Sequence, residues 1–254
     1  MIIRLRGRPA LPSTSGRAGG GRRGCDNRGV VESSAGRPAP PPVEARSLAA
    51  LVVAHRACTR CADAGLIPSA RPVFSGRPGQ RVLLVGQAPG PVEHDVTRPF
   101  AGRAGRELVR WMLRAGFADE EDFRARVWIT STTTCFPGRR PDGAGDRRPG
   151  PAEVALCAGW LEAVLHLLAP RLVIPVGSLA LSRLLGGLRL DDAVGRAFDA
   201  AGRPVEEASP TAGRVLVPLP HPSGQSRWLN DPARRRRLDA ALELLSGLLD
   251  WTVR

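Results

Sequence analysis

Four cysteines are the residues of this chain best suited to binding a metal. Cys58 and Cys61 form a C-x2-C pair, Cys135 follows an apolar run, and Cys157 lies in the apolar segment after it. The fifth cysteine, Cys25, has no obvious partner. Four such thiolates are suited to zinc or to an iron–sulfur cluster, and their spacing does not separate the two. The alternative is that they are unrelated buried thiols, since free cysteine is commonly buried.

A loop rich in glycine and proline follows the apolar run Val82–Val85 and is the second candidate site. It extends from Gly86 to about Gly102, whereas a strand–helix connection usually has about 2–6 residues. Long ordered loops are often functional. Its only aromatic residue is Phe100, for which anchoring of the loop is the alternative role. The positions that we expect to contact a ligand are Gly86, Gln87, Ala88, Pro89, Gly90 and Phe100.

Apolar runs alternate with helix-forming segments in the rest of the chain, which is typical of an α/β fold. The pattern predicts strands at Arg81–Val85, Val127–Thr130, Leu172–Val176 and Val215–Pro218. It predicts helices at Ser47–His55, Arg103–Ala115, Pro151–Leu168, Ser178–Leu185 and Asp231–Leu249. Strands that alternate with helices form a parallel sheet covered on both faces.

Each predicted strand ends in a sequence unlike an ordinary connection: GQAPG, TSTTTC, VGS and PHPSG. In an open parallel sheet these carboxyl ends lie side by side at the edge where ligands bind. The sequence therefore places Ser131, His221 and Ser223 near the glycine–proline loop. A lone histidine is more often structural, but the prolines on both sides of His221 fix its backbone, and its position favours a functional role.

The composition favours a polyanionic partner such as nucleic acid, because the formal net charge is +13 over 254 residues. Residues 1–46 hold nine arginines and three acidic residues, so about half of the excess lies outside them. We interpret 1–46 as a disordered basic leader and 47–254 as the folded domain. No apolar run of bilayer-spanning length and no secretory signal is evident, which predicts a cytoplasmic protein.

GQAPG followed by RPFAGRAG resembles the first motif of the bacterial and archaeal uracil-DNA glycosylases that carry an iron–sulfur cluster. HPS at His221–Ser223 and the cysteine positions match that family as well, and the resemblance covers about Ala57 to Leu249. It implies a three-layer αβα sandwich with a short central parallel sheet. It also implies a monomer that acts on DNA and holds a [4Fe–4S] cluster on Cys58, Cys61, Cys135 and Cys157, with zinc as the alternative.

The resemblance also implies roles for the loop residues. Phe100 corresponds to the aromatic residue that stacks on the base, and His221 to the histidine that stabilises charge on the departing base. The segment after the HPS motif enters the DNA in that family, which gives Arg227, Trp228 and Leu229 a role in filling the space left by the base. The alternative is that Trp228 and Leu229 anchor the last helix. Arginines between Cys135 and Cys157 are expected to contact phosphates, or to lie in a solvated loop.

Two positions depart from the family. Gln87 stands where the family has a glutamate, and a carboxamide orients water but cannot take its proton. Ser131 stands where the family has an asparagine that reads uracil, and a hydroxyl is shorter and more permissive. Glu93 and Asp95 are carboxylates that the same loop could supply instead.

We therefore expect a DNA glycosylase that excises uracil or a related deaminated base, with His221 and Gln87 as its catalytic residues. The alternative is a non-catalytic protein that binds damaged or single-stranded DNA on the same fold. A nucleotide-binding α/β enzyme is a third possibility, but no G-x-G-x-x-G or G-x-x-x-x-G-K-[ST] pattern follows the first strand.

Overall fold

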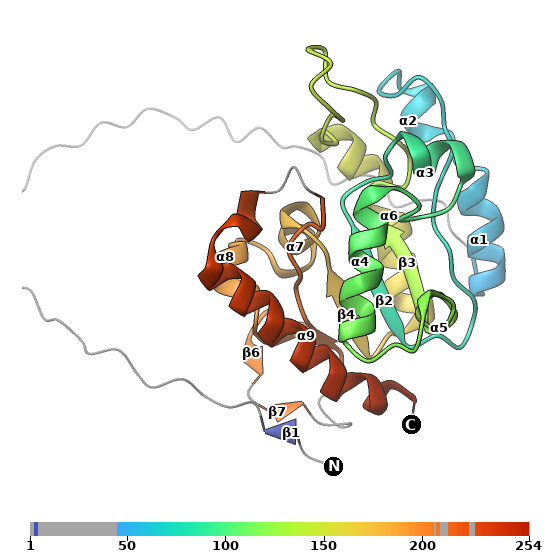
Figure 1. Cartoon of the computed structure of the whole chain (residues 1–254). Helices are drawn as coiled ribbons and strands as arrows, with labels where there is room; N and C mark the ends of the chain where they lie inside the picture. Colours follow the sequence, from blue (N-terminus) through green and yellow to red (C-terminus); the bar gives the residue numbers. More distant parts are fainter. Residues whose placement is uncertain (1–2, 5–44, 206, 209–212, 224–226, 254) are drawn as a thin grey trace, which may run out of the picture.

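The computed structural model describes residues 3–4, 45–205, 207–208, 213–223 and 227–253. Most of the predicted leader and Cys25 lie outside these residues. The described part is built on a six-stranded sheet in the order β3-β2-β4-β8-β5-β6, with helices on both faces (Figure 1). This confirms the predicted α/β class and the layered arrangement.

Four adjacent parallel strands form one side of the sheet, and they are the four that the sequence predicts. They are β2 (Val82–Gly86), β3 (Val127–Ser131), β4 (Leu172–Pro175) and β8 (Val215–Leu216). The sequence did not predict the antiparallel edge formed by β5 (Ala197–Asp199) and β6 (Pro204–Val205). A separate two-stranded pair joins β1 (Ile3–Arg4) to β7 (Glu207–Ala208). Ile3 and Arg4 therefore lie in a strand, although we expected residues 1–46 to be disordered.

The five predicted helices are present, with ends that differ by a few residues at most. They are α1 (Leu48–Arg56), α4 (Arg103–Arg114), α6 (Pro151–Leu168), α7 (Ser178–Leu185) and α9 (Pro232–Val253). Ser47 caps α1 by accepting a hydrogen bond from the backbone N–H of Ala50 at 3.2 Å. The sequence analysis missed the short helices α2 (Arg60–Asp63), α3 (Pro91–Val96), α5 (Glu120–Arg126) and α8 (Leu190–Ala193), and the 3-10 turn η1 (Arg227–Asn230).

Alternate residues of the central strands supply two separate cores. Leu84 and Ile129 belong to the core that includes residues of α4, α5 and α9. Leu83 and Trp128, the next residues along the chain, belong to the core that includes α1, α6 and α7. Because both faces are covered, β2 and β3 are buried along their whole length, which explains their unbroken apolar sequence.

The apolar helix α6 corrects one expectation. Its 18 residues have a mean hydropathy of 1.3, which is long and apolar enough to cross a membrane by length and composition. In the fold it packs against α1 and contributes Trp160, Leu161 and Val164 to the core. Burial against the sheet therefore accounts for its apolar sequence.

Candidate active site

The carboxyl ends of β2 and β3 form one wall of a site with Phe100. Gly86 and Ser131 are paired residues of these parallel strands. A Cβ added at Gly86 would lie 3.1 Å from the Phe100 ring and 3.2 Å from the Ser131 hydroxyl oxygen. Three residues that the sequence predicted to bind substrate are thus brought together, and a side chain at position 86 would crowd the other two.

The backbone of Phe100 is fixed by its conformation and by contacts to its carbonyl group. It has a φ of 52°, a conformation uncommon for a residue with a side chain. The Arg124 guanidinium donates hydrogen bonds to the carbonyls of Pro99 and Phe100 at 3.1 and 3.2 Å. A Cβ at Gly105 would lie 1.9 Å from the Phe100 carbonyl oxygen. Gly105 is therefore required for α4 to pack beneath the loop.

Glu93 stabilises the loop through hydrogen bonds to its backbone. Its two carboxylate oxygens accept hydrogen bonds from the backbone N–H groups of Gly90 at 3.1 Å and Gly102 at 2.8 Å. These contacts join the start of α3 to the start of α4. The sequence offered Glu93 as a replacement for the missing glutamate, but its carboxylate is already engaged by the backbone.

The loop that begins at Gln87 lies directly against the chain that follows β3. The Thr132 N–H donates to the Gly86 carbonyl at 2.9 Å, and the Thr133 N–H donates to the Gln87 carbonyl at 3.2 Å. Gln87 is half-buried. Of the other residues in the predicted binding turn, Pro89 is buried, while Ala88 and Gly90 are half-buried. The backbone of Gln87 is therefore fixed against the chain that follows Ser131.

His221 lies on the same edge, beyond the ends of β4 and β8. A Cβ at Gly177, which has a φ of 85°, would lie 3.3 Å from His221 Cδ2, so the ring packs closely on this turn. The Ser223 N–H donates to His221 Nδ1 at 3.2 Å, and the Ser223 hydroxyl lies 2.9 Å from the same nitrogen. Because a backbone N–H can only donate, Nδ1 is an acceptor and the ring proton is on Nε2. Burial lowers the pKa of His221, which favours the neutral ring.

All four predicted cysteine ligands line one cavity. The cavity is also lined by Thr133, Thr134 and Glu153, and none of the four cysteines is in a disulfide. Burial, with a smaller contribution from the neighbouring cysteines, raises the pKa of Cys61 to about 11 and that of Cys135 to about 12. Burial also raises the pKa of Cys157. The elements that supply these thiols are the α1–α2 region, the chain after β3, and α6.

The loop between Cys135 and Cys157 is tied to the cysteine cavity by Arg147. This arginine forms a bidentate ion pair with Glu153 at 2.6 and 2.8 Å, and it also donates to the carbonyls of Leu66 and Pro137. Arg140 pairs with Asp142 at the surface. Arg147 thus makes its contacts within the protein, which favours a structural role over the expected phosphate contact.

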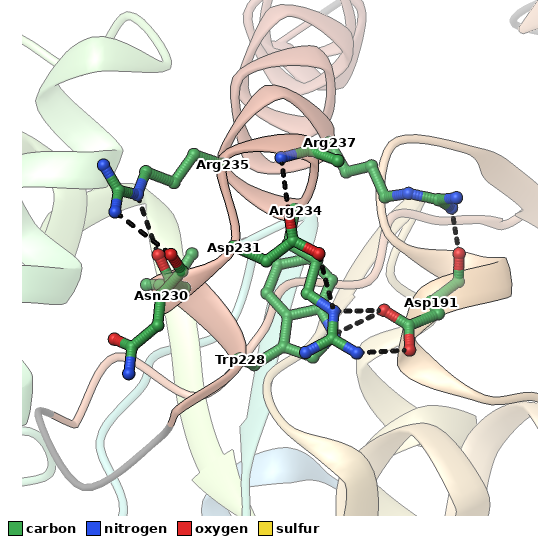
Figure 2. Close-up of polar contacts among 9 residues, drawn as sticks. Asp191, Trp228, Asn230, Asp231, Arg234, Arg235 and Arg237 are labelled. Atoms are coloured by element: carbon green, nitrogen blue, oxygen red, sulfur yellow. Dashed lines mark hydrogen bonds and ion pairs between the residues drawn. The ribbon is translucent and has the colours of Figure 1, made fainter.

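The segment after the HPS motif is anchored by Asp191 of α8 (Figure 2). Asp191 accepts hydrogen bonds from the Trp228 indole N–H at 2.9 Å and from the Arg234 guanidinium at 2.8 and 3.0 Å. Arg237 donates to the Asp191 backbone carbonyl. The hydrogen bond from Arg234 lowers the pKa of Asp191.

This arrangement favours the anchoring role that the sequence left open for Trp228. The residue is only 9% exposed, and Leu229 is partly buried against the same core. Arg235 donates to the carbonyls of Leu229 and Asn230, so it caps the 3-10 turn. Of the arginine run that opens α9, two members bind Asp191 and one binds the turn. Trp228 therefore packs against the core in this structure, and its predicted contact with DNA stays a prediction.

Sequence reasoning missed the structural roles of three residues that hold the site together. Gly177 is needed because His221 packs on it, and the Gly-Ser before a helix was its only signal. Glu93 lies three residues after Gly90, which is the spacing of a helix-capping glutamate. Asp191 gave no signal, because its partners lie far along the chain.

Comparison with known proteins identifies relatives along most of the described region. Residues 74–246 match the family model of the uracil DNA glycosylase superfamily. A type-4 uracil-DNA glycosylase of Thermotoga maritima is 29% identical over 163 residues, which are 64% of this chain and 75% of that protein. A type-5 uracil-DNA glycosylase of Thermus thermophilus is 31% identical over 192 residues, 70% of this chain and 82% of that protein. A type-4 enzyme of Pyrobaculum aerophilum is 33% identical over 122 residues, 46% and 57% of the two chains.

Proposed function

Because this chain belongs to the uracil-DNA glycosylase superfamily, we propose that it excises uracil or a related deaminated base from DNA. It is a DNA glycosylase of base excision repair, a hydrolase that acts on the N-glycosidic bond. The observation that supports this chemistry best is the convergence of Gly86, Phe100 and Ser131 at the sheet edge that also holds His221. Such an enzyme must take the base out of the stack, hold it and stabilise its departure.

His221 is the proposed donor to the departing base. Uracil leaves as an anion, so the bond can break before water attacks, and the charge on the base then needs a donor. The Ser223 N–H holds Nδ1 as an acceptor, which leaves the Nε2–H to donate. A neutral ring suits this task, since it stabilises the anion without first having to be protonated.

Phe100 and Ser131 are proposed to bind the flipped base. The Phe100 ring would stack on its face, and the Ser131 hydroxyl would meet its polar edge, with the glycines and Ala88–Pro89 of the turn completing the pocket. The close approach at Gly86 supports this assignment, because a side chain there would push Phe100 and Ser131 apart. A single hydroxyl discriminates less sharply than a carboxamide, so we propose a base preference broader than uracil alone.

Gln87 is proposed to orient the attacking water rather than to take its proton. Its backbone carbonyl accepts a hydrogen bond from the Thr133 N–H, which fixes this residue just after β2. Glu93 does not replace it as a base, because the backbone N–H groups of Gly90 and Gly102 occupy its carboxylate. Excision without a general base fits a mechanism in which bond cleavage precedes water attack.

The four cysteines are proposed to hold a [4Fe–4S] cluster. The donor set fits, since four free thiols line one cavity. In a [4Fe–4S] cluster each of the four thiolates would bind a different iron. The bound group would fix the chain after β3, which carries Ser131 at one end and Cys135 at the other.

DNA is the partner of this protein, and we propose that it acts as a monomer in the cytoplasm. Contacts with phosphates are assigned to exposed arginines, which include Arg139, Arg148 and Arg236. We propose that Arg227 and Leu229 approach the duplex while Trp228 anchors them through Asp191.

A single-turnover assay on oligonucleotides tests this function. The protein should convert a uracil-containing strand to abasic sites, and it should act more weakly on hypoxanthine and xanthine. Ser131→Asn should increase the ratio of uracil to hypoxanthine excision, whereas Thr252→Ser, which changes a buried threonine of α9, should not. Tight binding of damaged DNA without excision of any base would favour the non-catalytic alternative.

A further inference from the structure

A buried histidine lies behind the cysteine cavity in a position that the glycosylase chemistry does not use. His55, on α1, is 2% exposed. Its ring is stacked between Phe74 and Trp160, with both centroid distances 4.4 Å and interplanar angles of 15° and 2°. Burial lowers the pKa of His55 to about 3, so the ring is neutral at physiological pH. An apolar ring would fill this aromatic stack without the cost of burying polar nitrogens.

The polar contacts of His55 lead toward one of the cysteines. His55 Nε2 lies 2.9 Å from the Thr134 hydroxyl oxygen, and that oxygen lies 3.7 Å from Cys157 Sγ. The Thr134 backbone N–H also bonds to Cys157. Thr134 is 3% exposed and Cys157 is 8% exposed, so water does not compete for these contacts.

The direction of this chain follows from the chemistry of a bound thiolate. A thiolate sulfur can only accept, so the Thr134 hydroxyl must donate its hydrogen to Cys157. Its oxygen is then left to accept, and the available donor is the Nε2–H of His55. Each hydrogen bond in such a chain polarises the next.

We propose that His55 and Thr134 form a hydrogen-bond relay that tunes and retains the metal cluster through Cys157. The proposal rests on the cluster assigned above. Hydrogen bonds to the sulfurs stabilise the more negative, reduced cluster and so raise its reduction potential. Outer partners of metal ligands also strengthen the hold on the metal. His55 is thus a positioning residue that acts through Thr134, and the relay makes Cys157 the ligand most supported by the protein.

Neighbouring residues provide a matched control. Thr133 is also buried and lines the same cavity, but its hydroxyl has no partner among the residues that the structure describes. Thr134→Val and Thr133→Val therefore remove the same group from adjacent positions. His55→Phe keeps a ring in the stack and removes the two ring nitrogens, including the Nε2–H donor.

The test uses the purified full-length protein, and it reads the midpoint potential, the visible spectrum, the iron content and the rate of iron loss to a chelator. We expect Thr134→Val and His55→Phe to shift the potential to more negative values and to accelerate iron loss about tenfold. Thr133→Val should do neither. In the Thr134→Val background, His55→Phe should add little, because the relay is already broken.

Several results would overturn the relay. An unchanged potential and unchanged iron loss in both variants would do so, as would an equal effect of Thr133→Val. Additive effects of the two substitutions would show that His55 acts by packing alone. Wild-type protein that contains no iron would instead refute the proposed cluster, so the two failures are distinguishable.

Discussion

The region around the cysteines, the buried end, and the region at the start of α9, the charged end, are held by opposite kinds of polar contact. At the end near the cysteines, His55 and Thr134 are almost fully buried, and the imidazole is neutral. At the end near α9, the side chains of Asp191 and Arg234 are 31% and 34% exposed and form an ion pair. Desolvation accounts for the difference, because a buried charge is costly while a partly hydrated pair is not. The stability of the buried end should therefore depend on pH, and that of the charged end should depend on salt concentration.

The largest expected effect lies at the pocket between these two ends. His221→Ala should reduce single-turnover excision of uracil by about two to three decades, corresponding to roughly 3–4 kcal/mol of transition-state stabilisation. Gln87→Ala should cost less, since positioning water matters after the bond has weakened. A greater loss for Gln87→Ala would reverse the assigned roles.

The neutral state of His221 can be tested in the same assay. Its pKa is lowered by burial, so the active neutral ring should persist as the pH falls below 6.5, the usual value for histidine. We therefore expect the excision rate to fall only at a lower pH than an exposed histidine would give. A rate that rises as the ring protonates would contradict the neutral donor.

Acid should destabilise the buried end next most strongly. His55 has a folded pKa of about 3 against about 6.5 when unfolded, so between these values the unfolded chain binds more protons. The stability is complete above pH 6.5 and is progressively lost toward pH 3. Lowering the pH from 7 to 4.5 should cost about 2–3 kcal/mol from this residue alone.

Urea unfolding of wild type and His55→Phe at both pH values isolates this contribution. The wild type should lose more stability than the variant, because other titrating groups act equally in both. An equal loss would show that His55 is accessible to protons in the folded protein, and the contrast between the two ends would then fail.

The charged end should show a smaller effect that depends on salt. Asp191→Asn weakens the contacts to Trp228 and Arg234 and should reduce the free energy of unfolding by about 1–2 kcal/mol at low salt. The difference from wild type should shrink in high salt, where the pair is screened. Asp192→Asn, an exposed neighbour, is the control. If the difference in the free energy of unfolding does not depend on salt, packing rather than charge stabilises the contacts of Asp191.

The smallest effect is expected in the loop between the last two cysteines. Arg140 and Asp142 pair in the open, with side chains 54% and 51% exposed, so Arg140→Gln should change stability by less than about 0.5 kcal/mol. The measurement is a urea titration beside wild type. A loss of more than about 1 kcal/mol in the free energy of unfolding would show that this surface ion pair also stabilises the region around the cysteines.

Much of the fold could be predicted from the sequence because its central strands are buried on both faces. Continuous apolar runs such as Leu172–Pro175 have few other structures open to them. The edge strands β5 and β6 have only two or three residues, too few to show a pattern. The sequence did not predict helix α3, because its residues, PVEHDV, lie inside a loop rich in glycine and proline.

The sequence predicted which residues belong to the candidate site, but it did not predict which residues they contact. Chemistry and position singled out His221 and Phe100, and motif resemblance supplied their expected roles. Whether Trp228 points into DNA or into the core depends on Asp191, a residue of another helix. Arg147 likewise looked available to phosphate until Glu153 was seen to occupy it. Such partners are set by tertiary packing, which a linear motif does not record.

The parallel order of the sheet has a consequence for how the enzyme is made. The pocket wall comes from β2 and β3, whereas His221 follows β8, the last strand of the chain to join the sheet centre. Synthesis runs from the N-terminus, so this wall leaves the ribosome well before His221, the proposed donor. An unfinished chain would then hold the residues proposed to bind the base without the residue proposed to stabilise its departure. Cleavage activity should therefore appear only once synthesis is nearly complete, which keeps incomplete products from leaving abasic sites in the chromosome.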